Sequence, residues 1–452
     1  MQLNLNDIIK ATNAIGDFED IDIPVKSIKT DSRTVEPGDV FICLCGDRFD
    51  GHTFAKEAEK KGAIALVVHR PLDFIPSIPV LLVNDTVKAL GDIACFLRTN
   101  TKAKVVAITG SCGKTTTKEI AYAVLSQKFK VGKNLGNWNN QIGVPLSIFQ
   151  FQGEEDIWLL EVGINNKRDM DELGSILRPD IALILNVGPC HLQGLKDEET
   201  VAENKSKLLK YVNIDGVAII NGDNKALKET TSKYNINKMF FSKGEDIDIK
   251  FMGLVDRKGK FLIKYNNQEG TIILPFWGNH FEENLRAVLY LSFYFKLDFK
   301  DILTGLESLN LPNQRFKVVE SDKYIIIDDT YNANPMSMRA SLLATKELAK
   351  NRSFAVVLGD MAELGEREEV EHHKLGLFLK TIKPDVVFYK GKCAKLVQDT
   401  YGRENFFIVN DEDEFISFYK NSNFKDGVIL FKASRSIGLE KLLNKFKLEV
   451  GY

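Results

Sequence analysis

The sequence predicts an α/β protein with three domains: a small α/β domain, a central domain with a mostly parallel sheet, and a C-terminal domain with a Rossmann-like parallel sheet. Three observations support this fold class. The chain has 452 residues, whereas ordinary domains have roughly 100–200. An apolar run after residue 104 leads directly into a glycine loop and a helical segment. Beyond residue 320, apolar runs alternate regularly with helical segments.

Composition indicates a globular protein. The content is 44% hydrophobic and 27% charged, and the 60 Lys and Arg nearly balance the 62 Asp and Glu. A net charge of -2 gives no general attraction for nucleic acid or acidic membranes. The first ten residues lack a signal-peptide pattern, and no apolar run approaches the roughly 18 residues of a membrane span. We expect a soluble, cytoplasmic monomer that binds neither nucleic acid nor membrane.

The first domain is expected over residues 1–100. Two strand-like runs, 39–44 and 62–68, accompany a helical stretch around 52–62. The polar stretch RTNTKAK then marks a change of composition, so the second domain starts near residue 101.

The central domain is expected over residues 101–312. Three apolar runs have the character of buried parallel strands, namely 105–110, 157–163 and 180–188. Residues 245–275 instead have the pattern of antiparallel hairpins, and a helix follows over 278–295. A break at LNLPNQRFKVV places the start of the third domain near residue 313.

The C-terminal domain, 313–452, alternates strands and helices, which implies a parallel sheet with right-handed crossovers. Its expected strands are 324–329, 354–360, 385–391, 406–410 and 427–432. Ligands bind beyond the C-terminal ends of the strands in such sheets. The candidate site segments are therefore DDTYNANP, GDMAELGE and KASRS.

The stretch VVAITGSCGKTTTKE predicts ATP binding by a P-loop ATPase-like domain. Backbone N–H groups and a helix N-terminus would face an anion, Lys114 would neutralise the β- and γ-phosphates, and the Thr115 hydroxyl would face Mg²⁺. Ile108 stands where a strict Walker loop has glycine, so the match is to a shorter G-x-x-G-K-T-T form. The expected ATP-binding loop comprises Gly110, Ser111, Cys112, Gly113, Lys114, Thr115 and Thr116.

Two polar residues near other strand ends are candidates for the same metal. Glu161 ends one apolar run and His191 follows another, and together they could complete a Mg²⁺ site beside the phosphate loop. Taken alone, Glu161 could equally be an ordinary charged residue at a strand end, and His191 an ordinary histidine in a loop. A phosphate loop alone fits kinases, motor ATPases and ligases, and no N-K-x-D motif of a GTPase is present in the sequence.

An ordered series of motifs resembles the Mur ligases over essentially the whole chain. The motifs are TGSCGKTTTKE, GNWNNQIGVPLS, LNVGPCHLQGL, GNHFEEN, PNQRF, DDTYNANP and LGDMAELGE. The resemblance implies a ligase that uses ATP to convert a peptide carboxylate to an acyl phosphate, which an amine then attacks. The three domains would bind a UDP-linked substrate, ATP and the incoming amino acid or dipeptide, in that order.

The resemblance also implies roles for residues. Thr115, Glu161, His191 and Lys205 would hold Mg²⁺, Lys205 as a carbamate, and we expect Lys207 and Lys210 to face water instead. Asn284 would contact adenine, although Phe281 replaces an asparagine found in many relatives. Arg315 and Asp329 would reach the nucleotide from the third domain. The implied catalytic residues are Lys114, Lys205, His191, Arg315 and Asp329.

Substrate residues follow from the same resemblance. Ser32 and Arg33 would contact uracil or diphosphate, with a surface ion pair between Asp31 and Arg33 as the alternative. Asn139 and Asn140 would lie near the muramoyl group. The third domain resembles that of members that add D-alanyl-D-alanine to UDP-N-acetylmuramoyl-tripeptide. This resemblance implies that the dipeptide pocket contains Asn332, Asn334, Asp360 and Glu363.

Three alternative functions remain. A Mur ligase that adds the third residue and a folate polyglutamylating enzyme would share the fold and the ATP chemistry. An ATP-operated binding protein would bind nucleotide without any ligase reaction.

Overall fold

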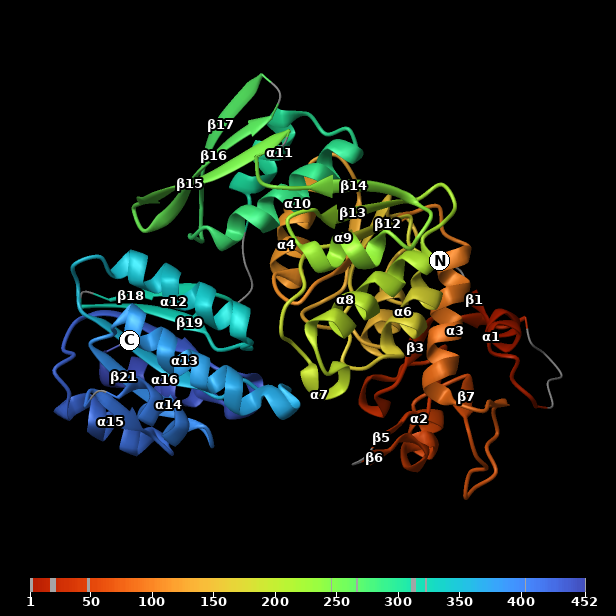
Figure 1. The fold of residues 1–452 in the computed structure, drawn as a ribbon. Helices are drawn as coiled ribbons and strands as arrows, with labels where there is room; N and C mark the ends of the chain where they lie inside the picture. The colour runs from red at the N-terminus through yellow and green to blue at the C-terminus, as the bar shows by residue number, and fades with distance from the viewer. Residues whose placement is uncertain are drawn as a thin grey trace.

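The computed structural model describes residues 3–16, 22–46, 49–244, 246–265, 267–309, 314–321, 323–402 and 404–451. Three units follow one another along the chain, each with its own mainly parallel sheet. In Figure 1 the first unit is red to orange, the central unit orange to green, and the third unit cyan to blue. The predicted α/β class with three units is confirmed. No helix in the described ranges is both long and apolar enough to cross a membrane.

The first unit contains a four-stranded parallel sheet in the order β3-β4-β7-β8. Its strands are β3 (Ser27–Lys29), β4 (Asp39–Ile42), β7 (Ala65–Val68) and β8 (Val80–Leu82). Two short antiparallel pairs are β1 (Leu3–Asn4) with β2 (Pro24–Val25), and β5 (Cys45–Gly46) with β6 (Phe49–Asp50). The helices are α1 (Leu5–Thr12), η1 (Ser32–Thr34), η2 (Gly51–Phe54), α2 (Ala55–Lys60) and α3 (Thr86–Thr99).

Helix α3 joins the first unit to the central one (Figure 1). Gly91 allows a close approach to α6 (Asp169–Leu177), since a Cβ there would lie 2.8 Å from Ile176 Cδ1 and would force that side chain to move. Arg98, only 6% exposed, donates from Nε to the Leu177 carbonyl at 2.7 Å and from Nη2 to the Asp180 carboxylate at 2.8 Å. Arg98 thereby satisfies a carbonyl at the end of α6 and fixes the first unit onto the central unit.

We expect Arg98→Leu to lower the free energy of unfolding by about 3 kcal/mol, because it leaves the Asp180 carboxylate without its buried partner. Urea unfolding measures this loss. Lys104→Leu is the matched control, since Lys104 pairs with the same carboxylate at 3.3 Å but its side chain is 62% exposed. That variant should lose less than about 1 kcal/mol. Equal losses of unfolding free energy in the two variants would show that the burial of Arg98 does not determine the strength of its ion pair.

The central unit is built on a six-stranded, wholly parallel sheet in the order β10-β11-β9-β12-β13-β14. Its strands are β9 (Lys104–Thr109), β10 (Val131–Lys133), β11 (Ile157–Glu161), β12 (Ile181–Ile184), β13 (Val217–Asn221) and β14 (Asn237–Phe241). Besides α6, the helices along it are α4 (Lys114–Leu125), α5 (Gly143–Ile148), α7 (Leu192–Leu195), α8 (Glu198–Ser206), η3 (Lys207–Tyr211) and α9 (Lys225–Thr231). Strand β9 lies between β11 and β12, so the loop after it opens in the middle of the sheet.

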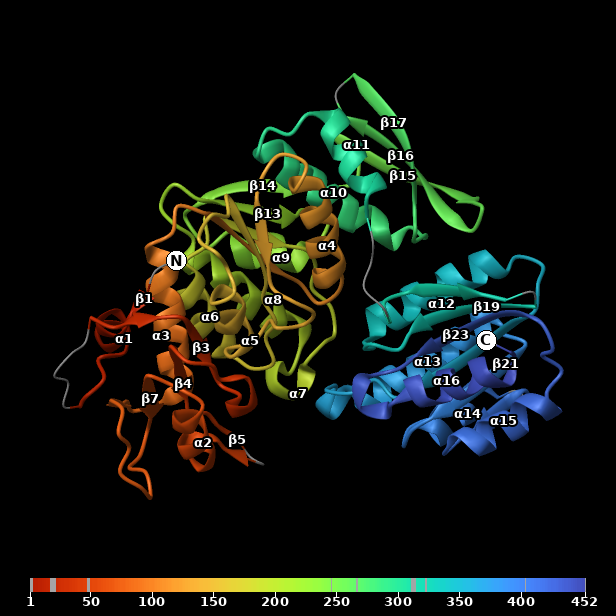
Figure 2. The ribbon, with the colours of Figure 1, turned by 180° about the vertical axis from the view of Figure 1, so that it is seen from behind.

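The hairpins predicted over 245–275 are confirmed. They form a three-stranded antiparallel sheet of β15 (Ile247–Val255), β16 (Lys258–Tyr265) and β17 (Gln268–Leu274). Helices α10 (His280–Tyr294) and α11 (Phe299–Glu307) follow. Seen from behind, this sheet stands apart from the parallel sheet and above the third unit (Figure 2).

The third unit has a six-stranded sheet in the order β18-β19-β23-β20-β21-β22. Its strands are β18 (Lys317–Glu320), β19 (Tyr324–Asp329), β20 (Phe354–Gly359), β21 (Val386–Lys390), β22 (Phe406–Ile408) and β23 (Gly427–Lys432). The helices are α12 (Pro335–Ala349), η4 (Gly365–Arg367), α13 (Glu368–Ile382), α14 (Ala394–Tyr401), α15 (Glu412–Asn421), η5 (Arg435–Ile437) and α16 (Leu439–Glu449).

Five of these strands are parallel, as predicted, whereas β18 is an antiparallel edge strand that the sequence did not predict. Only four residues form β18, and both of its ends are exposed and charged. Strand β23 lies between β19 and β20, with Asp329 paired to Lys432. The three predicted loops therefore begin at neighbouring strand ends.

Candidate active site

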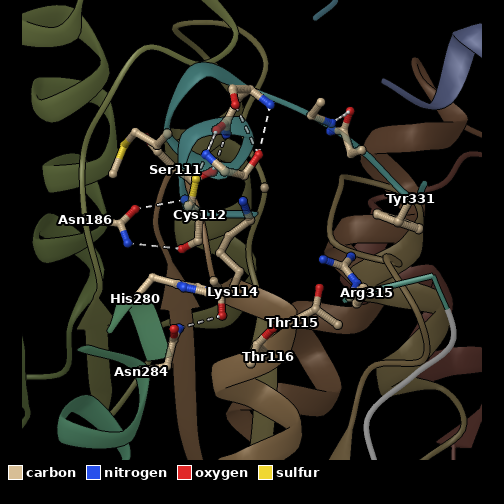
Figure 3. A pocket seen from close by; sticks show the side chains of 18 of the residues that line it. Ser111, Cys112, Lys114, Thr115, Thr116, Asn186, His280, Asn284, Arg315 and Tyr331 are labelled. Carbon is tan, nitrogen blue, oxygen red and sulfur yellow. Dashed lines mark hydrogen bonds between the residues drawn. The ribbon is translucent and has the colours of Figure 1, made fainter. Parts of the chain in front are cut away.

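A cavity of about 530 Å³ lies between the central and third units (Figure 3). The C-terminal ends of strands from both sheets open into it, as the rule for parallel sheets predicts. Fifteen of the residues predicted from the sequence line the cavity. They are Ser111, Cys112, Gly113, Lys114, Thr115, Thr116, Asn139, Asn140, Glu161, His191, Asn284, Arg315, Asp329, Asn332 and Asn334.

The phosphate loop joins β9 to α4 with the geometry of an anion-binding turn. Gly113 has φ +79°, and a Cβ there would lie 2.3 Å from Asn284 Nδ2, so only glycine fits. Lys114 is the first residue of α4, and its Nζ donates to the Gly110 carbonyl at 2.9 Å. Asn284 Nδ2 donates to the Gly113 carbonyl at 3.2 Å. The loop thus places backbone N–H groups, a cation and a helix N-terminus at one point.

Asn186, which the sequence analysis missed, fixes the shape of this loop. Its Oδ1 accepts from the Cys112 N–H at 2.8 Å, and its Nδ2 donates to the Cys112 carbonyl at 3.3 Å (Figure 3). Nδ2 also donates to Glu283 Oε1 at 2.6 Å, and burial raises the pKa of Glu283. Asn186 follows a buried strand, so the rule that found Glu161 could have found it too.

Three of the four predicted metal ligands, Thr115, Glu161 and His191, line the cavity, whereas Lys205 does not. Glu161 is 2% exposed, and its carboxylate accepts from Thr115 Oγ1 at 2.6 Å and from Asn139 Nδ2 at 2.8 Å. His191 lies across the cavity with its Nδ1 2.5 Å from Glu363 Oε2. This contact holds the pKa of Glu363 below its ordinary value. The Glu161 carboxylate and the Thr115 hydroxyl, which are in contact, offer oxygen ligands of the kind that Mg²⁺ prefers.

Lys205, at the end of α8, lies directly behind the phosphate loop. Its side chain is 1% exposed, and Nζ donates to the Gly110 carbonyl at 3.1 Å. Burial lowers the pKa of Lys205 to about 8. Lys207 and Lys210 instead contact Asp171 near the surface, with side chains 26% and 51% exposed. Lys205 is thus buried while its two neighbours lie nearer the surface, and its role as a metal ligand stays a prediction.

The third unit contributes a second charged cluster. Asp329 Oδ2 accepts from Lys432 Nζ and from Ser341 Oγ, both at 2.6 Å. The Arg315 guanidinium lies 3.9 Å from the ring centroid of Tyr331. Lys432 belongs to the predicted segment KASRS but was not singled out, because a strand-end lysine gives no sign of burial by itself. This cluster faces the phosphate loop across the cavity.

Asn334 connects the two units. As the N-cap of α12 it accepts from the Ser337 N–H at 2.9 Å, and its Nδ2 donates to the Ser111 carbonyl at 3.2 Å. Cys112 Sγ lies 3.1 Å from Asn334 Oδ1. The adjacent Asn332 contributes its carbonyl to Lys432 at 3.1 Å. Both asparagines therefore have structural partners at the rim of the cavity.

Other predicted residues lie away from the cavity as its described lining defines it. Asp360 is 4% exposed and accepts from Tyr389 Oη at 3.1 Å and from the Lys392 N–H at 2.7 Å. In the first unit, Ser32 Oγ donates to Glu57 Oε2 at 3.2 Å, and Arg33 forms the surface ion pair with Asp31 at 2.7 Å. Their substrate roles stay predictions.

Three family models match the chain in order. They are the Mur ligase family catalytic domain over residues 24–96, the Mur ligase middle domain over 108–292, and the Mur ligase glutamate ligase domain over 314–435. These matches, together with the whole-length relatives described next, show that the chain belongs to the Mur ligase family.

Within that family, the chain is similar over its whole length to one kind of ligase. The UDP-N-acetylmuramoyl-tripeptide–D-alanyl-D-alanine ligase of Bacillus subtilis (strain 168) is 32% identical over 449 residues, which cover 97% of this chain and 96% of that protein. MurF from Acinetobacter baumannii has a TM-score of 0.90 at 30% identity and covers 98% of each chain. MurF ligase from Thermotoga maritima, solved with ADP, has a TM-score of 0.84 at 31% identity, covering 94% of this chain and 98% of that chain.

A folylpolyglutamate synthase from Mycobacterium tuberculosis is a more distant neighbour. It has a TM-score of 0.63 at 14% identity and covers 81% of this chain and 95% of that chain. At this identity the likeness shows a shared fold alone. It therefore gives no support to folate as a substrate.

Proposed function

We propose that this chain is an ATP-dependent ligase that joins D-alanyl-D-alanine to UDP-N-acetylmuramoyl-tripeptide, giving the pentapeptide precursor of peptidoglycan. One observation carries the proposal. The phosphate loop, Glu161, His191 and the pair Arg315 and Asp329 line one cavity, in a chain similar over 97% of its length to a ligase named for these two substrates.

The reaction requires that three substrates meet in this cavity. The terminal carboxylate of the tripeptide attacks the γ-phosphorus of ATP, giving an acyl phosphate and ADP. The amine of D-alanyl-D-alanine attacks the acyl carbon, and the tetrahedral intermediate expels inorganic phosphate. Lys114 and the loop N–H groups stabilise charge on the phosphate oxygens, and Arg315 adds a cation from the third unit.

We propose that Thr115, Glu161, His191 and a carbamylated Lys205 hold Mg²⁺. When bound, Mg²⁺ would neutralise phosphate charge and provide a Lewis acid. The buried position of Lys205 supports the carbamate, since an unmodified ammonium there would repel a divalent cation. A pKa of about 8 also leaves part of the amine uncharged near neutral pH, which is the form that adds CO₂. The carbamate oxygens are hard ligands of the kind that Mg²⁺ prefers.

The remaining assignments belong to the same proposal. Residues 1–100 would bind the UDP end of the substrate through Ser32 and Arg33, residues 101–312 would bind ATP, and residues 313–452 would bind the dipeptide. The last boundary falls at residues that lie outside the described ranges. Asn332, Asn334, Asp360 and Glu363 remain the candidate dipeptide residues. The enzyme would act as a monomer in the cytoplasm.

Mass spectrometry tests the proposal directly. The purified chain, incubated with ATP, Mg²⁺, UDP-N-acetylmuramoyl-tripeptide and D-alanyl-D-alanine, should give a product heavier than the tripeptide by one condensed dipeptide. Omitting ATP or the dipeptide should abolish that product and the release of phosphate. Product from a UDP-muramoyl-dipeptide with a diamino acid, or from folate with glutamate, would favour one of the other ligases. Nucleotide binding without substrate-stimulated phosphate release would indicate a binding protein.

A further inference from the structure

The helix after the phosphate loop carries a second lysine, which is entirely buried. Lys118 lies one turn after Thr115 in α4 and is 0% exposed. Its Nζ donates to the Asn134 carbonyl at 2.6 Å and to the Gly136 carbonyl at 3.1 Å, and lies 3.5 Å from Glu119 Oε1. A buried ammonium is costly unless such partners surround it. Its side chain cannot reach a substrate, so its role lies in what it holds.

Lys118 holds a loop that reaches the cavity. Residues 134–140 connect β10 to the segment before α5, and Asn137, Asn139 and Asn140 of this loop line the cavity. The Asn134 side chain binds both backbone groups of Glu161: Oδ1 accepts from its N–H at 2.9 Å, and Nδ2 donates to its carbonyl at 3.0 Å. The start of the loop is therefore joined both to the phosphate-loop helix, through Lys118, and to the end of β11, through Asn134.

Charge supports this arrangement. Burial lowers the pKa of Lys118, and the carboxylates of Glu161 and Glu119 oppose that shift. The ammonium thus lies in the field of a carboxylate that the proposed mechanism requires. An apolar side chain of similar length would leave two loop carbonyls without a donor and would remove a cation that faces Glu161.

We propose that Lys118 is a positioning residue for the acceptor substrate: it fixes loop 134–140 against the phosphate-loop helix and, through Asn134, fixes Glu161. The inference deepens the proposed function and rests on it. On the proposed function, Asn139 and Asn140 of the loop lie beside the UDP-muramoyl peptide, whereas the phosphates of ATP lie at the N-terminal end of α4. Loss of the Lys118 ammonium should therefore affect the acceptor more than the nucleotide.

The test is Lys118→Met, which keeps a long side chain but removes the charge and all three donors. Steady-state kinetics should show KM for UDP-N-acetylmuramoyl-tripeptide raised about tenfold and kcat lowered on the order of 10²-fold, as small misplacements of reacting groups do. Calorimetry should show Kd for ADP within about twofold of wild type, because the Lys118 Nζ contacts only Asn134, Gly136 and Glu119 among the described residues, none of which is assigned to the nucleotide. Lys130→Met is the control, since Lys130 is 69% exposed and pairs only with Glu154 among the partners found.

Asn134→Ala breaks the other end of the same connection and should give the same split between KM and Kd. If Lys118→Met does not fold, the kinetics of Asn134→Ala test the inference instead. A folded Lys118→Met enzyme with unchanged kinetics, or with KM and ADP affinity altered equally, would overturn the inference. Absence of any ligation by the wild-type chain would instead overturn the proposed function.

Discussion

Lys114→Ala should lower ligation by at least ~10²-fold, because a preorganised cation at the transferring phosphoryl group stabilises charge that develops only in the transition state. Lys114 begins α4 and lines the cavity, and its Nζ donates only to the Gly110 carbonyl in the contacts of the described residues. Removing it should therefore leave the fold intact. Phosphate release and product mass, measured with saturating ATP, check the loss.

Lys128→Ala is the matched control, since this residue lies just beyond the same helix and, among the residues that the structure describes, its Nζ donates only to the exposed Lys296 carbonyl at 3.3 Å. Its turnover should equal that of wild type. A Lys114→Ala enzyme that kept near-wild-type turnover would remove the phosphate loop from the mechanism.

Lys205→Ala should also lose activity on the order of 10²-fold, since it removes the anion proposed to bind the metal beside the γ-phosphate. The side chain is buried behind the phosphate loop, so its removal leaves a small space lined by the Gly110 carbonyl. Formate or acetate should enter this space, replace the carbamate oxygens and restore part of the activity. The measurement is the rate of ligation as a function of added carboxylate.

Lys207→Ala should behave like wild type and should not respond to added carboxylate, because its amine contacts Asp171 near the surface. Full activity of Lys205→Ala would contradict the assignment. An unmodified Lys205 amine in a crystal structure with Mg²⁺ and nucleotide bound would also contradict it.

Much of the fold could be predicted because its signals are local. Strands buried on both faces read as continuous apolar runs, which is why β9, β11, β12 and the strands of the third unit were found. Strand β18 was not, since four residues with charged ends carry no such run. The phosphate loop was recognised because glycines, lysine and threonine act through backbone geometry that their order alone specifies.

Side-chain contacts between distant segments could not be predicted in the same way. Lys118 acts through the loop that it binds, and its sequence neighbours in the helix give no sign that it is buried. Asp360 stands at a strand end like Asp329, yet one faces the interior and the other the cavity. Which way a strand-end carboxylate turns depends on the loop that follows, so sequence position alone cannot distinguish them.

Because Gly91 and Arg98 hold α3 against α6, the first and central units are held at a fixed distance from each other. On the proposed assignment, Ser32 and Arg33 hold the uridine end of the substrate, and Lys114 marks where the reacting carboxylate must arrive. Each peptide residue adds at most about 3.5 Å of reach. In a substrate one residue too short, the terminal carboxylate would thus lie about 3.5 Å short of the γ-phosphate. A peptide one residue too long would have to fold back. On that assignment, the fixed spacing between the two sites selects for the length of the peptide.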